Sequence, residues 1–335
     1  MVKRNRTSSE PFQSVETLED LLSMPTTPVV TALAKLKGDF VVLGVSDPAG
    51  SSLAQLLKRA FVSAKIKHHV IGVASVAEAG SEATLQSAGI ETVNCDLLDD
   101  DLVRKLPEAP NVICMPGTGA DAAEDEASRW AANTLLPAVV CKRYRQSRVV
   151  AFSTGNIYEP TLVSQGGSVE SDPVAPVGER AMSCLGRERI FEYFSQKNGT
   201  PVALVRLSHV CELRYGILAE LAKQVWEGEV IDLAGGYFNA IWQSDAHTAV
   251  IQALAHAASP ALIINVTGPE ILSVHKVCED FGRWMNRQPK FTGAESPTAL
   301  LSNARQAGRL FGPPHVKADQ MMRWVAEWVM RGERN

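Results

Sequence analysis

Gly44, Asp47 and Gly50 are spaced three residues apart, as in the turns through which many α/β proteins hold phosphate groups. A short run of β-forming residues, 39–43, precedes them, and apolar residues follow at helical spacing between 53 and 61. In such a strand–turn–helix unit, backbone N–H groups at the start of the helix bind the pyrophosphate of a dinucleotide. Asp47 stands where the middle glycine is expected, so the pattern favours the fold more than the ligand.

The carboxylate of Asp47 has two interpretations. Aspartate is a preferred helix N-cap, and proline, here Pro48, is favoured at the first helical position, so the pair predicts a capped helix. The same carboxylate would repel a phosphate, since two like charges about 4 Å apart cost ~4 kcal/mol at an effective dielectric near 20. Even half of that energy lowers an affinity more than tenfold. We therefore expect weak dinucleotide binding unless the turn moves.

Strand-like and helix-like segments alternate along most of the chain, which predicts an α/β fold with a Rossmann-like, doubly wound parallel sheet. The predicted strands are residues 39–43, 69–74, 90–95, 111–115, 148–152, 202–207 and 262–266. From residue 208 onward shorter segments interrupt the alternation. A smaller C-terminal α/β substrate lobe is expected there.

This pattern divides the chain into three parts. Residues 1–37 form an N-terminal extension with short helices at 14–22 and 29–36, which we expect to pack beside the sheet. Residues 38–207 form the Rossmann-like, dinucleotide-binding type of domain. Residues 208–335 form the substrate lobe, interleaved with the final sheet strands and ending in a helix.

Composition excludes several classes of function. The 335 residues carry a formal net charge of −4, which does not favour binding to nucleic acid or to an anionic membrane. No apolar run approaches the ~20 residues of a membrane span. The six cysteines are scattered without a CxxC spacing, which favours buried thiols in a reducing compartment. With a basic start that lacks an apolar region, we expect a cytoplasmic protein, and the scattered histidines predict no metal site.

The order and spacing of several short motifs resemble the NAD-dependent epimerase/dehydratase family, also called the extended short-chain dehydrogenases/reductases. The motifs are VVLGVSDPAGSSLA at 41–54, CDLLD at 95–99, FSTGNIY at 152–158, the segment 176–188, VRLSHV at 205–210, WQSDA at 242–246 and INVTGPE at 264–270. The resemblance implies NAD or NADP in the N-terminal half. It also implies a sugar, a sugar nucleotide or a related carbohydrate-like small molecule in the C-terminal lobe.

The family catalyses hydride transfer with a Ser or Thr, a Tyr and a Lys, the Lys lowering the pKa of the Tyr. Thr154 matches the Ser/Thr and would hydrogen-bond the reacting oxygen. The register of the following helix puts Arg180 at the Tyr position and Cys184 at the Lys position, so the acid/base pair is missing. Gly155 and Asn156 stand where the dehydratase branch has an Asp-Glu pair, so that elimination chemistry is not supported either.

Three residues near these positions keep alternative interpretations. Tyr158 corresponds to a tyrosine that borders the substrate pocket of relatives, and it either packs in the wall or takes part in catalysis. Cys184 is either a nucleophile activated by a nearby cation or a plain buried thiol. Arg180 binds a carboxylate or phosphate of a ligand, or it forms a surface ion pair.

The cofactor positions after the phosphate turn are similarly mixed. Asp96 and Leu97 match the adenine-contacting positions of relatives, although Asp96 also fits a loop residue at a strand end. The ribose-reading acid of the family would fall near Ala74 and Ser75. Neither of these can hold a 2′-hydroxyl bidentately or pair with a 2′-phosphate.

The resemblance places four residues at the substrate lobe. His209 follows VRLS and is expected to contact substrate. Asn239, Trp242 and Asp245 lie where relatives line that lobe. Asp245 instead serves as an N-cap if a helix begins at Ala246.

Three functional hypotheses remain. The first is a diverged family member that lacks the Tyr/Lys chemistry and works by binding a carbohydrate-like ligand or a partner. The second is an active NAD(P)-dependent oxidoreductase or epimerase on a carbohydrate derivative, using substitute acid/base residues. The third is a subunit that forms a homodimer, or pairs with an active paralogue, through family-type dimer helices.

Overall fold

The computed structural model describes residues 14–75, 82–115 and 125–332, so residues 1–13 of the expected N-terminal extension lie outside it. Within these ranges, seven parallel strands form one sheet in the order β12-β7-β5-β4-β1-β2-β3. The strands are β1 Phe40–Leu43, β2 Val70–Ala74, β3 Glu91–Asn94, β4 Asn111–Cys114, β5 Arg148–Thr154, β7 Val202–Leu207 and β12 Leu262–Val266. This confirms the predicted doubly wound parallel sheet, whose order reverses between β1 and β4.

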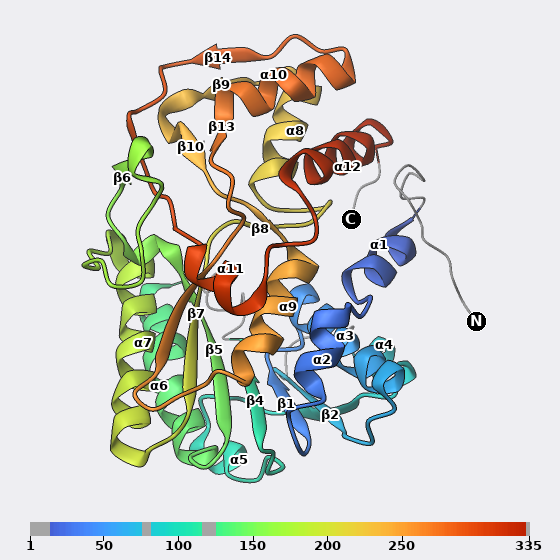
Figure 1. The fold of residues 1–335 in the computed structure, drawn as a ribbon, viewed down its shortest axis with the longest axis vertical. Coiled ribbons are helices and arrows are strands. Elements are labelled where there is room, and N and C mark those ends of the chain that lie inside the picture. Colours follow the sequence, from blue (N-terminus) through green and yellow to red (C-terminus); the bar gives the residue numbers. More distant parts are fainter. Residues whose placement is uncertain (1–13, 76–81, 116–124, 333–335) are drawn as a thin grey trace.

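Helices cover both faces of this sheet (Figure 1). Alternate strand residues point to opposite faces, so Val42 joins one core while Val41 and Leu43 join the other. The first face is covered by α2 Thr27–Leu33, α3 Pro48–Ala64, α4 Glu82–Ser87, α9 Gln243–Leu254 and α11 Arg305–Phe311. The second is covered by α5 Asp100–Val103, α6 Glu126–Arg143 and α7 Gly178–Asn198. The carboxyl ends of the strands are left to border the smaller lobe.

The smaller lobe lies beyond those carboxyl ends, at the top of Figure 1. Its helices are α8 Ile217–Glu227, α10 Val274–Met285 and α12 Ala318–Met330. The short strands and 3-10 turns outside the main sheet are β6 Thr161–Leu162, β8 Val210–Cys211, β9 Val230–Asp232, β10 Tyr237–Phe238, β11 Ile241–Trp242, β13 Leu272–Ser273, β14 Lys290–Thr292, β15 Thr298–Ala299, η2 Gly155–Ile157, η3 Val163–Gln165 and η4 Leu233–Gly235. Met321, Val325 and Trp328 of α12 are buried in the lobe core, which is separate from the two cores against the sheet.

The N-terminal extension joins the two parts of the molecule. Val29 and Leu33 of α2 pack on the sheet, as expected. The expectation is wrong in part for α1 (Val15–Leu22), because its apolar residues Leu18 and Leu22 belong to the core of the smaller lobe. The extension therefore ties the lobe to the sheet by hydrophobic burial.

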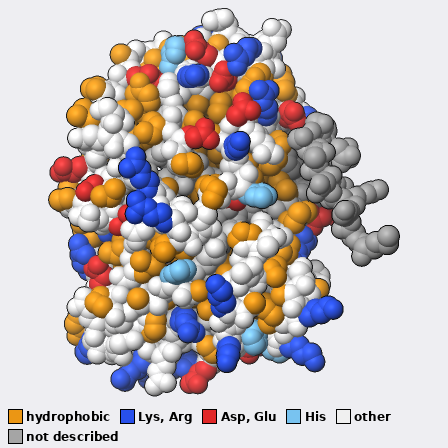
Figure 2. Space-filling view, viewed as in Figure 1, with side chains coloured by type: hydrophobic (Ala, Val, Ile, Leu, Met, Phe, Trp, Pro, Cys, Tyr) orange, Lys and Arg blue, Asp and Glu red, His pale blue; other side chains and the backbone are white. Residues whose placement is uncertain are grey.

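The cysteines, the length of the helices and the surface charges can be compared with the expectations from composition. All six cysteines lie in the described part of the chain, are buried, and form no disulfide, as the sequence predicts. Among the described residues, no helix has both the length and the apolar character needed to cross a bilayer. Acidic and basic side chains both occur across the face shown in Figure 2.

Candidate functional site

A cavity of about 1130 Å³, called here the main cavity, lies where the carboxyl ends of the sheet strands meet the smaller lobe. Asp47, in the turn that follows β1, and Met115, directly after β4, border it, so it lies at the point where the strand order reverses. Open α/β sheets bind their ligands at this place. The cavity brings together six of the predicted site residues: Asp47, Thr154, Tyr158, Arg180, Cys184 and His209.

The glycine turn has the close packing expected of a phosphate-binding turn. Gly44 has a φ of +100°, and a Cβ atom there would overlap the carbonyl oxygen of Met115. A Cβ atom at Gly50 would overlap the carbonyl oxygen of Gly44. Both positions therefore require glycine, because the start of α3 approaches the end of β1 closely.

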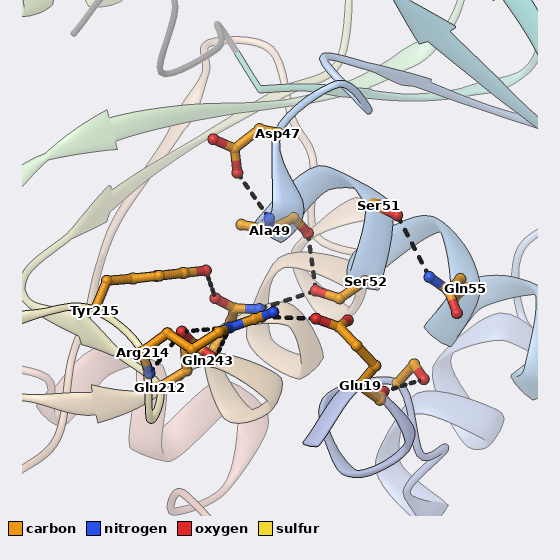
Figure 3. Close-up of polar contacts among 11 residues, drawn as sticks. Glu19, Asp47, Ala49, Ser51, Ser52, Gln55, Glu212, Arg214, Tyr215 and Gln243 are labelled. Atoms are coloured by element: carbon orange, nitrogen blue, oxygen red, sulfur yellow. Dashed lines mark hydrogen bonds and ion pairs between the residues drawn. The ribbon is translucent and has the colours of Figure 1, made fainter. Parts of the chain in front are cut away.

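Asp47 is the N-cap of α3, which confirms the capping interpretation. Its Oδ1 accepts a hydrogen bond from the N–H of Ala49 at 2.7 Å, and Pro48 is the first helical residue (Figure 3). The N–H that a phosphate would use is thus taken by a carboxylate of the same chain. A dinucleotide pyrophosphate does not fit this turn as it stands, because its charge has the same sign as that of the cap.

The other predicted cofactor positions lie outside the main cavity. Ser75 donates its N–H to the Oγ of Ser46 at 3.0 Å, so the end of β2 bonds back to the glycine turn. Asp96 accepts from the N–H of Leu98 at 2.9 Å, which is the geometry of a turn at a strand end. Leu97 is half-buried and packs on the core beside α5 and α6. A role in contacting adenine stays a prediction for both residues.

Helix α7 provides one wall of the cavity through Arg180 and Cys184. The Sγ of Cys184 lies 3.8 Å from Nη2 of Arg187 and 4.0 Å from Nδ2 of Asn133. Arg187 also donates to the carbonyl oxygen of Phe152 at 2.7 Å and to the Oδ1 of Asn133. The cation beside the position matched to the family Lys is therefore Arg187. The sequence analysis missed it, although its place one turn after Cys184 gives the signal.

A buried polar network lies beneath this wall. Arg206 and Glu188 form an ion pair at 2.7 Å, with side chains 2% and 0% exposed. Ser153 donates to the Oε1 of Glu188 at 2.5 Å. Arg206 donates to the hydroxyl of Tyr158, which in turn donates to the Oδ1 of Asn265 at 2.9 Å. These five side chains are called the buried network below.

Tyr158 borders the cavity, but its hydroxyl belongs to the buried network. Burial raises the pKa of Tyr158, and the opposing effect of Arg206 does not cancel that increase. A phenol with a raised pKa stays protonated near neutral pH and makes a poor base. These contacts give Tyr158 a positioning role in the wall, and catalysis by it stays a prediction.

Thr154 and His209 enter the cavity from the ends of β5 and β7. The Oγ1 of Thr154 accepts from the N–H of Asn156 at 3.1 Å, and Asn156 also lines the cavity. A Cβ atom on Gly155 would overlap the hydroxyl oxygens of Ser208 and Ser302, so that position has no room for an acid. His209 has a φ of +41°, which is uncommon for a residue with a side chain and frequent at functional sites. Enclosure by protein lowers the pKa of His209.

The remaining predicted substrate residues do not border the main cavity. Asn239 donates to the carbonyl oxygen of Glu270 at 3.0 Å and accepts from the N–H of Ser302 at 3.1 Å. Trp242 is fully buried, with its ring centroid 5.3 Å from that of Trp324.

Asp245 borders a separate cavity of about 340 Å³ and accepts from the N–H of Val316 at 2.9 Å. The alternative that it caps the helix is wrong, since α9 begins at Gln243 with Trp242 as the N-cap residue.

Among the cavity residues that were not predicted from the sequence are also Tyr215, Gln243 and His247. Tyr215 donates its hydroxyl to Gln243, which donates to the Oγ of Ser52 at 2.9 Å (Figure 3). His247 lies one turn after Gln243 and is 2% exposed. Burial lowers its pKa to about 3. Polar residues four apart on an otherwise apolar helix face were the available signal.

Comparison with solved structures finds proteins of the same fold. The UDP-glucose 4-epimerase of Thermotoga maritima with UDP-glucose has a TM-score of 0.70 at 14% identity, covering 88% of this chain and 99% of that one. The UDP-glucuronic acid 4-epimerase of Bacillus cereus in complex with NAD has a TM-score of 0.69 at 17% identity, covering 88% and 99%. The dTDP-glucose 4,6-dehydratase of Bacillus anthracis in complex with NAD has a TM-score of 0.70 at 16% identity, covering 89% and 98%.

Comparison with the sequences of curated proteins finds no match. The sequence profile of the NAD dependent epimerase/dehydratase family, in contrast, matches residues 40–266 of the 335. The chain belongs to that family, as the motifs suggested.

Proposed function

We propose that this family member binds a carbohydrate-like ligand in the main cavity and lacks the family's Tyr/Lys hydride chemistry. One observation carries the proposal: the α7 wall presents Arg180 and Cys184 at the positions matched to that pair. An arginine stays protonated near neutral pH and cannot act as the proton-exchanging phenol. Tyr158, which borders the same cavity, is engaged in the buried network with a raised pKa.

The chemistry of the cavity supports a carbohydrate-like ligand. Its walls carry neutral hydrogen-bonding groups on Thr154, Asn156, His209 and Tyr215, which suit the hydroxyl groups of a sugar ring. Similar structures hold UDP-glucose and UDP-glucuronic acid, so these sugar nucleotides are the first compounds to test.

The proposed function does not require tight binding of NAD or NADP. NAD is present in similar structures. Here the carboxylate of Asp47 repels the pyrophosphate of the cofactor. Neither Ala74 nor Ser75 can hold the ribose 2′-hydroxyl bidentately. When bound, the cofactor supplies hydride transfer, for which the proposed role has no need.

A second function is favoured by the contact of Cys184 with Arg187. A guanidinium 3.8 Å from a thiol stabilises the thiolate, and a thiolate can exchange protons or act as a nucleophile. In this alternative the chain is an active NAD(P)-dependent oxidoreductase or epimerase on a carbohydrate derivative. Cys184 then replaces the missing acid/base pair, and Arg187 supplies the positive charge beside it.

We also propose that the chain pairs through α6 and α7, with a second copy or with an active paralogue. These two helices pack together along the left edge of Figure 1. Their outer surfaces expose Leu135, Met182 and Tyr193, with exposed fractions of 58%, 45% and 55%. Light scattering at micromolar concentration tests the homodimer, and a monomeric mass would contradict it. The buried thiols outside disulfides support a cytoplasmic location.

Calorimetry and product analysis together test the proposed function. The wild-type protein is titrated with UDP-glucose and UDP-glucuronic acid, with and without NAD, and the mixtures are then separated by chromatography. We expect binding of at least one sugar nucleotide that is independent of NAD, with no new product. Turnover that needs NAD would support the active enzyme instead, and the absence of binding to both compounds would contradict the proposed function.

A further inference from the structure

His247 carries a buried imidazole whose Nδ1 has no hydrogen-bonding partner among the described residues. The residue is 2% exposed. Buried polar side chains are nearly always paired, because an unpaired one has lost its hydration without compensation. Since His247 also lines the main cavity, its ring lies beside any ligand bound there.

The position of His247 on α9 separates it from ordinary core packing. The face of α9 that carries Val250 and Leu254 packs into the core against β5 and β7. One and two turns earlier the same face carries His247 and Gln243, and there it borders the cavity. Gln243 has both of its amide atoms engaged, by Tyr215 and by Ser52. Among the polar residues of this face, His247 is the one left for a ligand.

The state of the imidazole suits a hydroxyl group. Burial lowers the pKa of His247 to about 3, and no nearby charge contributes to that shift. The ring is therefore neutral at pH 7, with one N–H donor and one nitrogen acceptor. His209, also on the cavity wall, has a lowered pKa for the same reason. The carboxylates of Asp47 and Glu220 line the cavity too and disfavour an anionic group beside them.

We propose that His247 is the specificity-determining residue of the main cavity and hydrogen-bonds a hydroxyl group of the carbohydrate ring bound there. This inference rests on the proposed function, since it needs a carbohydrate-like ligand in this cavity. It adds an orientation: the hydroxyl-bearing ring faces α9. No covalent step is involved, and His247 acts through its neutral ring.

The stability of the free protein gives the first test, with His247→Leu as the variant. A group that is paired only in the complex destabilises the free protein, so its replacement by an apolar side chain of similar size should raise Tm by about 2–4 °C. If the imidazole served packing alone, the same change would lower Tm. Thr248→Val on the next residue is the matched control, because its hydroxyl bonds within α9 to the carbonyl oxygen of Ser244.

Binding of UDP-glucose and UDP-glucuronic acid, measured by calorimetry, gives the second test. We expect His247→Leu to weaken binding about tenfold, His247→Gln to recover part of it, and Thr248→Val to match the wild type. A lower Tm for His247→Leu, or unchanged binding by it, would overturn the inference and leave the proposed function standing. Failure of the wild type to bind either compound would overturn both.

Discussion

The buried network and the main cavity lie next to each other, but their polar side chains differ in how they are paired. In the network, Ser153, Tyr158, Glu188, Arg206 and Asn265 are joined by hydrogen bonds and an ion pair. All five come from the segments that carry the family resemblance, at 152–158, 176–188, 205–210 and 264–270. The segments that resemble the family therefore contain the residues whose buried bonds stabilise the fold.

In the cavity wall, polar and charged side chains do not form such a closed network. Asp47 bonds to its own helix, where a phosphate would otherwise bind. Cys184 and Arg180 line the cavity, and we propose that they replace the proton-transferring pair. His247 makes no hydrogen bond to any described residue through its Nδ1. The difference teaches that the scaffold and its chemistry can change separately, since function depends on the site and not on the fold.

Breaking the network should have the largest effect on stability. Although burial alone lowers the pKa of Arg206, the Glu188 carboxylate raises it overall, so the pair is charged. Arg206→Met leaves the Glu188 charge buried without its partner, and we expect a loss of about 3–5 kcal/mol in the free energy of unfolding by urea. The double variant Arg206→Met/Glu188→Leu should recover much of this loss. A single variant within 1 kcal/mol of the wild type would show that the network does not support the fold.

The pH dependence of stability probes the cavity wall. Because the folded pKa of His247 is about 3, below the usual ~6.5, the unfolded chain takes up a proton in this range and the folded chain does not. The free energy of unfolding is therefore unaffected by this group above pH ~6.5, and it decreases as pH falls from there towards 3. By pH 5 the wild type should have lost about 2 kcal/mol that His247→Leu retains. Parallel pH profiles for the two proteins would contradict the burial of a neutral imidazole.

The ion pair between the extension and the smaller lobe should have the smallest effect on stability. Glu19 of α1 pairs with Arg214 at 2.7 Å, and Arg214 also pairs with Glu212 at 3.0 Å (Figure 3). Because Glu19 is partly exposed and Arg214 keeps its second partner, Glu19→Gln should cost at most about 1 kcal/mol. A change of Leu18 to Ala in the same helix should cost more, about 2–5 kcal/mol, because that side chain is fully buried. Urea unfolding of both variants checks this order, and the reverse order would contradict it.

Much of the fold could be predicted from the sequence, because strand and helix periodicities are local. The seven strands lie within a few residues of their predicted places. The burial of α1 in the smaller lobe could not be predicted, since the apolar stripe of Leu18 and Leu22 indicates burial without indicating the partner.

The candidate site was only partly predictable for a similar reason. The motifs identified Asp47, Thr154, Arg180, Cys184 and His209 as candidate site residues, and the structure brings all five to one cavity. His247 was missed because its significance lies in the absence of a partner, which depends on side chains far away in the sequence.

Titration with NADH, followed by fluorescence, tests the central claim that the scaffold remains without tight cofactor binding. Asp47→Gly restores the missing glycine, and Asp47→Asn keeps a capping side chain while removing its charge. We predict millimolar or weaker binding by the wild type and at least tenfold tighter binding by both variants, from the like-charge repulsion of ~2–4 kcal/mol. Micromolar binding by the wild type, equal to that of both variants, would contradict the account.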